Sequence, residues 1–128
     1  MEIVKDKIEI LCREYIPNRE IFCHKDLTRE RWSRFSFDEQ MANIGAEVGR
    51  TINRRHKDSE QSSKHFEIGL ELLDLTIDDE KNKSKFEKLC EVRNNLVKYF
   101  CFDNADNLSD EKWNSYFYAF NYAARNKI

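Results

Sequence analysis

Apolar residues recur every three or four positions along most of this chain, which is the spacing of one face of an α-helix. The clearest stripe consists of Met41, Ile44, Val48 and Ile52. The other stripes are Val4, Ile8, Leu11 and Tyr15, then Phe66, Leu70, Leu73 and Ile77, then Phe86, Leu89, Leu96, Val97 and Phe100, and finally Trp113, Phe117, Phe120 and Ala124. The pattern predicts five helices, over residues 2–16, 36–57, 59–76, 82–102 and 109–126, with these faces turned inward.

Polar residues and one proline mark several helix ends. Pro17 ends the first helix, because the residue before a proline avoids the helical conformation. Ser36 followed three residues later by Glu39 predicts a capping box at the start of the second helix. Ser109, followed by Asp110, predicts the N-cap of the last helix. The polar residues 18–34 predict a loop with a short helix, for which Phe22 and Trp32 are candidate anchors.

These elements predict an all-α protein, a four-helix up-down bundle with an additional N-terminal helix. The connections between the last four helices are short, which favours antiparallel neighbours. A length of 128 residues fits this division, with an N-terminal helix and polar connector over 1–35 and a four-helix bundle over 36–128.

Two glycines lie beside the stripe of the second helix. Gly45 and Gly49 are four residues apart and therefore share a face. Glycine weakens a helix interior, so two on one face predict that a neighbouring helix approaches closely at both.

Composition narrows the possible functions. With a net charge of −2 the chain has no overall positive field for nucleic acid, so RNA contact would need a local patch. No apolar stretch approaches the ~20 residues of a membrane span or has the form of a signal peptide, so we expect a cytoplasmic protein without a membrane partner. The four cysteines include no Cys-x-x-Cys pair. We therefore expect buried free thiols, no metal site and no cofactor.

One charged residue falls within an apolar stripe. Arg93 lies between Leu89 and Leu96 on the inward face, where a charge is unfavourable unless it is paired or hydrated. In one interpretation its guanidinium meets a carboxylate such as Glu47 or Glu71. In the other, Arg93 and the adjacent Asn94 line a polar cleft that faces a phosphate or a partner protein.

The sequence around Arg93 resembles the motif region of HEPN domains, short helical bundles of prokaryotic toxin–antitoxin and defence systems. Arg93, Asn94, Leu96, Val97 and Tyr99 match the pattern, but Lys98 stands where the family has its histidine. The resemblance implies a dimer and a metal-independent RNase in which Arg93, Asn94, Lys98 and Tyr99 are the candidate catalytic residues. Lysine, with an ordinary pKa near ~10.4, is a poor replacement for the histidine, so the motif is degenerate.

Two further segments, residues 42–50 and 70–76, are similar to a group of small prokaryotic proteins that we associate with nucleotidyltransferase partners. HEPN proteins are likewise often paired with nucleotidyltransferases. A nucleotidyltransferase is therefore the partner that the resemblance implies, with a homo-oligomer as the other possibility.

A second Arg–His pair, Arg50 and His56, also has the HEPN spacing. Six residues along a helix place two side chains on different sides, so they converge only if the helix ends between them or a second chain contributes. Arg50, Arg54, Arg55 and Lys57 form a local basic patch that could bind RNA or an acidic surface. The same charges suit a solvated helix C-terminus.

Other candidates have simpler interpretations. The aromatic residues at 113–122 could stack on bases, but their helical spacing favours core or a helix–helix interface. His65 has no Asp or Cys at ligand spacing and is expected to be structural. The acidic pairs Asp78–Asp79 and Glu71–Asp74 are expected at a turn and on a solvated helix face.

Three functions follow from these observations. The first is a HEPN-like helical protein that acts through protein–protein contacts, as one component of a toxin–antitoxin or antiviral defence module paired with a nucleotidyltransferase. The second is a metal-independent HEPN-type RNase that acts as a dimer. The third is a structural helical adaptor in which Arg93 is only a satisfied core ion pair.

Overall fold

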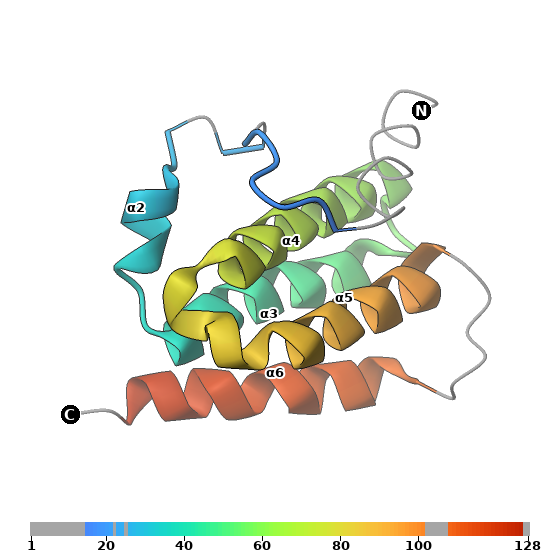
Figure 1. Ribbon diagram of the computed structural model, residues 1–128. Helices are drawn as coiled ribbons and strands as arrows, with labels where there is room; N and C mark the ends of the chain where they lie inside the picture. Colours follow the sequence, from blue (N-terminus) through green and yellow to red (C-terminus); the bar gives the residue numbers. More distant parts are fainter. Residues whose placement is uncertain (1–14, 22, 25, 102–107, 127–128) are drawn as a thin grey trace.

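The computed structural model describes residues 15–21, 23–24, 26–101 and 108–126, and the regular structure in these ranges is entirely helical (Figure 1). The expected all-α class is thereby confirmed. The elements are α2 (Arg29–Ser33), α3 (Phe37–Arg54), α4 (Ser59–Asp78), the 3₁₀ helix η1 (Glu80–Lys85), α5 (Phe86–Cys101) and α6 (Asp110–Arg125). The helix expected over 2–16 lies outside the described residues except for its last two, Tyr15 and Ile16, which are not helical.

The expected helix caps are present. The Ser36 hydroxyl accepts a hydrogen bond from the Glu39 backbone N–H at 3.1 Å, and the Glu39 side chain accepts one from the Ser36 N–H at 2.9 Å. Ser109 accepts from the Lys112 N–H at 3.2 Å and so caps α6. These side chains satisfy N–H groups that have no partner within the helix.

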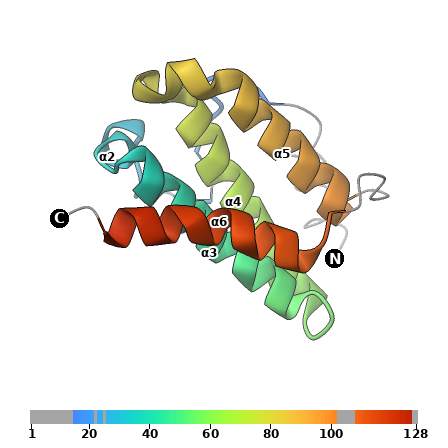
Figure 2. The same ribbon diagram turned by 90° about the horizontal axis from the view of Figure 1, so that it is seen from below.

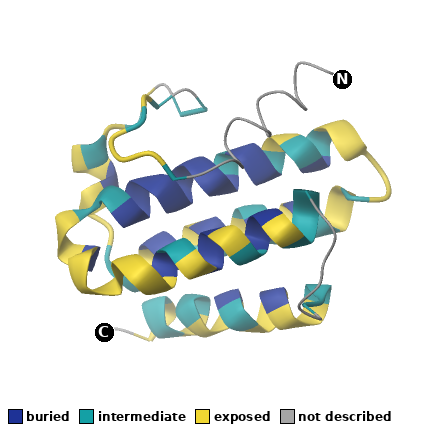
Figure 3. Cartoon of the chain, turned by 45° about the vertical axis from the view of Figure 1, so that its right-hand side comes forward, coloured by how far each residue is buried: buried dark blue, intermediate teal, exposed yellow. Residues whose placement is uncertain are grey.

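α4 is the central helix of the fold. It packs against α3 on one side and α5 on another, while α6 packs on the outer side of α3. Figure 2 shows α6 crossing α3 obliquely, and Figure 3 shows how continuously the residues of α4 are buried. Every residue from Gly69 to Ile77 is buried, which explains why this segment is apolar around most of its circumference.

The start of the next helix differs from the expectation. Residues 80–85 form a 3₁₀ helix rather than the first turn of α5. Buried Asn82 donates to the Gln40 side-chain oxygen at 2.9 Å and to the Thr76 carbonyl at 3.0 Å, which fixes this tighter turn. The change of helical period moves Phe86 outward, so the prediction that Phe86 faces the core is wrong, and its side chain is 45% exposed.

The two glycines of α3 have different surroundings. A Cβ atom at Gly45 would lie 2.5 Å from the Cβ of Phe117, so α6 approaches α3 there as expected. A Cβ atom at Gly49 would meet no atom within 4 Å, so the expectation of close approach is wrong at this position. The oblique crossing in Figure 2 gives the reason, since two crossing helices touch closely over only part of their length.

None of the helices in the described ranges has both the length and the apolar content needed to cross a bilayer.

Candidate functional site

Arg93 lies inside the molecule, in a two-point ion pair with Asp74. Its Nε donates to Asp74 Oδ1 at 2.6 Å and its Nη2 to Asp74 Oδ2 at 3.3 Å. Arg93 is 1% exposed and Asp74 is 4% exposed. The expected carboxylate partner exists, but it is Asp74 rather than Glu47 or Glu71, so that choice of partners was wrong.

The two carboxylates that were expected to pair with Arg93 bind other groups. Glu47 projects from α3 and binds His65 and Arg50. Glu71 lies one turn before Asp74 on α4 and binds the chain at Cys23 and His24. Each of these two carboxylates is therefore already bound to donors other than Arg93.

Burial has a clear effect on the acid of this pair. It raises the pKa of Asp74 because the charged carboxylate is separated from water, while the hydrogen bonds and charge of Arg93 act in the opposite direction. The pKa of the neighbouring Cys90 thiol is raised by burial as well. Arg93 therefore favours the ionised form of Asp74, against the burial that raises its pKa.

The other motif residues do not share a cleft with Arg93. Asn94 and Lys98 are exposed on the outer side of α5. Tyr99 is half-buried and its hydroxyl donates to Asp110 Oδ1 at 2.6 Å; burial and this hydrogen bond raise the pKa of Tyr99. The motif is thus divided between the core, the surface of α5 and the contact with α6, and Arg93 and Asn94 do not line a common polar cleft.

The second candidate pair is also separated. Arg50 lies on α3 and donates to Glu47 Oε1 at 2.8 Å, whereas His56 lies in the turn after α3 and is exposed. Glu47 Oε2 is 2.8 Å from His65 Nδ1, so the Glu47 carboxylate bridges Arg50 and His65. His65 therefore has an acidic partner that its local sequence spacing did not reveal.

The basic patch has one member with a structural role. Arg55 lies over the rings of Tyr99 and Phe100, at 4.8 and 4.9 Å from their centroids, and donates to the Tyr99 carbonyl at 3.2 Å. It connects the end of α3 to α5. Arg50, Arg54 and Lys57 are exposed and keep the surface charge that the sequence predicted.

His24 and Glu71 form a pair that was not predicted from the sequence. His24 Nδ1 is 3.1 Å from Glu71 Oε1, and the backbone N–H groups of Cys23 and His24 donate to the same carboxylate at 3.1 Å. Glu71 and Asp74 are both buried, so the prediction of a solvated face for them is wrong. The sequence did contain a signal for this burial. Glu71 and Asp74 lie in the segment 69–77, which has apolar residues on every side of the helix and so leaves no solvated face.

His24 also lines a surface hollow of about 300 Å³. Arg50 and Glu47 contribute to the same hollow from α3. Its other lining residues are Leu27, Trp32, Phe35, Asn43, Ala46 and Leu72. The hollow therefore brings an oriented histidine and an arginine together against an apolar wall, a combination that no sequence spacing indicated.

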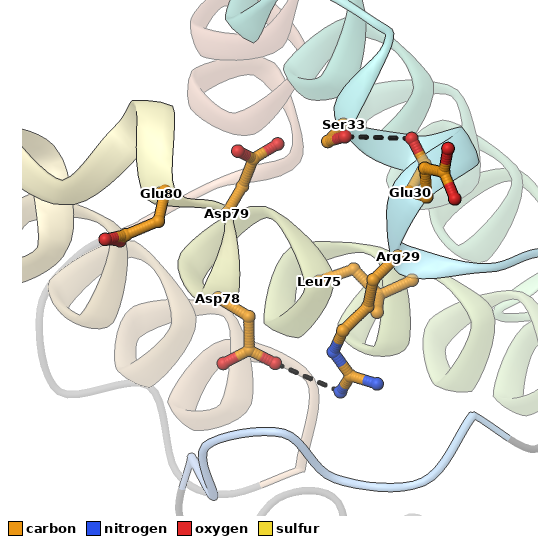
Figure 4. A pocket seen from close by; sticks show the side chains of 7 residues that line it. All are labelled: Arg29, Glu30, Ser33, Leu75, Asp78, Asp79 and Glu80. Carbon is orange, nitrogen blue, oxygen red and sulfur yellow. Dashed lines mark hydrogen bonds and ion pairs between the residues drawn. The ribbon is translucent and has the colours of Figure 1, made fainter.

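A second hollow, of about 280 Å³, lies between α2 and the end of α4. Figure 4 shows the guanidinium of Arg29 directed at the carboxylate of Asp78, at 3.1 Å. Asp79 accepts from Lys81 and from Gln40. Burial acts to raise the pKa of Asp79, but these hydrogen bonds outweigh it and the pKa is lowered. The acidic side chains around this hollow are therefore partly neutralised from within the chain.

Over the described parts of the chain, no three His, Cys, Asp or Glu side chains are grouped to hold a metal ion. Cys23, Cys90 and Cys101 are half-buried, so Cys90 and Cys101 are less buried than expected. Phe22 and Cys12 lie outside the described residues.

Comparison of the chain with protein-family models, with curated proteins and with solved structures finds no match. The assignment of a function therefore depends on the geometry above and on the sequence resemblance.

Proposed function

We propose that this chain is a non-catalytic HEPN-like interaction module, one component of a toxin–antitoxin or antiviral defence pair whose partner is a nucleotidyltransferase. The observation that carries the proposal is the burial of Arg93 in its ion pair with Asp74. A guanidinium that is 1% exposed does not meet a substrate phosphate. With Lys98 in place of the family's histidine, the motif keeps an arginine with a structural role and lacks the residue that supports RNA cleavage in the family.

The outer surface supports a role in protein contacts. Tyr118 and Tyr122 lie one turn apart on α6 and are 65% and 60% exposed. Exposed tyrosines contribute strongly to protein interfaces, because a rigid ring adds contact area at a low entropic cost. Asn94 and Lys98 add polar groups on the outer side of α5. The proposal therefore places the partner-binding surface on the outside of α5 and α6.

The proposal has three further parts. The four long helices form an up-down bundle, which is supported by their short connections and by the packing of α3 on α4 and α6. A homo-oligomer is the alternative to the complex with a nucleotidyltransferase. The chain acts in the cytoplasm, as the sequence analysis expects.

Affinity purification of the tagged chain from its native host tests this function. We expect a nucleotidyltransferase to co-purify with the wild type. The amount recovered should fall at least about tenfold in the Tyr118→Ser/Tyr122→Ser variant, because two interface tyrosines together commonly contribute more than ~1.4 kcal/mol to binding. The matched control is Glu60→Ser/Lys64→Ser, which changes two exposed residues at the start of α4. Recovery of only the chain itself would contradict the proposal.

A metal-independent RNase is the second candidate, and one observation favours it. Arg50 and His24 line the same hollow, and the Glu71 carboxylate lies 3.1 Å from His24 Nδ1, which fixes the orientation of the imidazole ring there. If the chain cleaves RNA there, its expression slows bacterial growth, and His24→Gln or Arg50→Met restores growth while His56→Gln does not. Purified chain that leaves tRNA and mRNA intact would remove this candidate.

A further inference from the structure

Residues 15–21 cross the outside of α4 as an irregular segment, which we name the N-terminal strap (Figure 1). The Tyr15 hydroxyl donates to Asp78, and the Asn18 backbone N–H donates to the same carboxylate at 3.2 Å. Just beyond the strap, the N–H groups of Cys23 and His24 donate to Glu71. Two carboxylates of α4 thus hold this part of the chain, Asp78 at the start of the strap and Glu71 just after its end.

The strap passes the residue that holds Arg93. Its two anchors on α4, Glu71 and Asp78, lie one turn before and one turn after Asp74, so all three carboxylates share one face of the helix. The Tyr15 ring packs edge-on against Phe86 of α5 at 5.8 Å, so it spans from α4 to α5. The strap therefore runs over the face of α4 from which Asp74 binds Arg93.

The attachment of the strap is polar rather than apolar. Ile16, Pro17, Asn18 and Glu20 are exposed, and the remaining strap residues are only partly buried. A segment that buries little apolar surface opens locally at a lower free energy than the core. In the hollow of Figure 4 the Asp78 carboxylate is also part of the lining, where it meets the guanidinium of Arg29 from α2.

We propose that the strap is a releasable cover, with Asp78 as its latch, whose opening gives the Arg93–Asp74 pair access to solvent. In the closed form Arg93 is a structural residue. In the open form the Arg93–Asp74 pair is exposed to solvent at the surface of α4 and α5.

The test compares the wild type with Tyr15→Phe, which removes one hydroxyl from the latch and keeps the ring against Phe86. Phenylglyoxal modifies accessible arginines, and peptide mapping gives the rate at each one. Relative to exposed Arg125, we expect Arg93 to react about tenfold faster in Tyr15→Phe, the size of effect expected when one hydrogen bond to a carboxylate is lost. The matched control is Tyr118→Phe, on exposed α6, which leaves the Arg93 rate unchanged.

A second readout follows the strap itself. Hydrogen exchange of the Asn18 N–H should accelerate about tenfold in Tyr15→Phe, while the amides of Leu72 and Leu73 within α4 keep their rates. Equal acceleration at Asn18 and in α4 would mean global unfolding and would overturn the proposal. An unchanged Arg93 rate together with a faster Asn18 amide would also overturn it, because the strap would then open without uncovering the pair. Both measurements use the purified chain alone, so their outcome is independent of whether a nucleotidyltransferase binds.

Discussion

Arg93→Met is expected to lower the free energy of unfolding by about 3–5 kcal/mol, the largest single effect that the structure predicts. The substitution keeps much of the side-chain volume but leaves the Asp74 carboxylate buried without its guanidinium. An unpaired buried charge is far more unfavourable than a lost surface ion pair, which contributes only ~0–1 kcal/mol. Denaturant unfolding followed by circular dichroism measures the difference.

Two controls separate this explanation from a simple packing defect. Lys98→Met, an exposed change on the same helix, should stay within about 0.5 kcal/mol of the wild type. The double variant Arg93→Met/Asp74→Leu should recover most of the loss, because an apolar pair can replace a buried ion pair. A double variant no more stable than Arg93→Met alone would contradict the ion-pair account.

The dependence on pH provides a further check on the same variant. Burial raises the folded-state pKa of Asp74, and loss of Arg93 removes the influence that opposes this rise. Between the unfolded and folded pKa values the folded state binds more protons, so stability falls as pH rises through that window. The deficit of Arg93→Met should therefore be smaller near pH ~4 than at pH ~7, where the unfolded carboxyl is fully ionised.

Gly45→Ala should destabilise the fold by about 1–3 kcal/mol, the usual effect of inserting a methyl group where no room exists. Its Cβ would lie 2.5 Å from the Phe117 Cβ and 2.9 Å from Cγ, so α6 must move away from α3. Thermal unfolding should show a lower midpoint for this variant.

Gly49→Ala is the matched control, one turn away on the same helix. It meets no atom within 4 Å and should stabilise the protein by up to about 1 kcal/mol through the higher helix propensity of alanine. If both variants unfold at the same midpoint, α6 does not cross α3 at Gly45 as described.

Much of the fold follows from local sequence. The capping box at Ser36 and the cap at Ser109 depend on residues within three positions, and both form as expected. The predictions of a close approach at Gly49 and of a buried Phe86 were wrong for a different reason. The angle at which α6 crosses α3, and the hydrogen bonds that fix η1 around Asn82, depend on contacts between segments far apart in the chain.

The candidate site shows the same division. The apolar stripe correctly marked Arg93 as a charge that needs a partner, because this follows from helical periodicity alone. The choice of Asp74 depends on how α5 rotates and slides against α4, which carries buried acidic residues at 67, 71 and 74. The meeting of His24 with Glu71, 47 residues apart, depends on the path of the N-terminal strap and the segment after it.

The chain acts, in our proposal, through protein contacts, while Arg93 serves as a structural ion pair with Asp74. The most direct measurement is quantitative affinity purification of Arg93→Met/Asp74→Leu from the native host, after circular dichroism has shown that the variant is folded. We expect the folded double variant to recover the same nucleotidyltransferase, within about twofold of the wild-type ratio, a difference well below the ~1.4 kcal/mol of a tenfold loss. A folded double variant that recovers none, when the wild type does, would show that Arg93 itself carries the function and that the proposal is wrong.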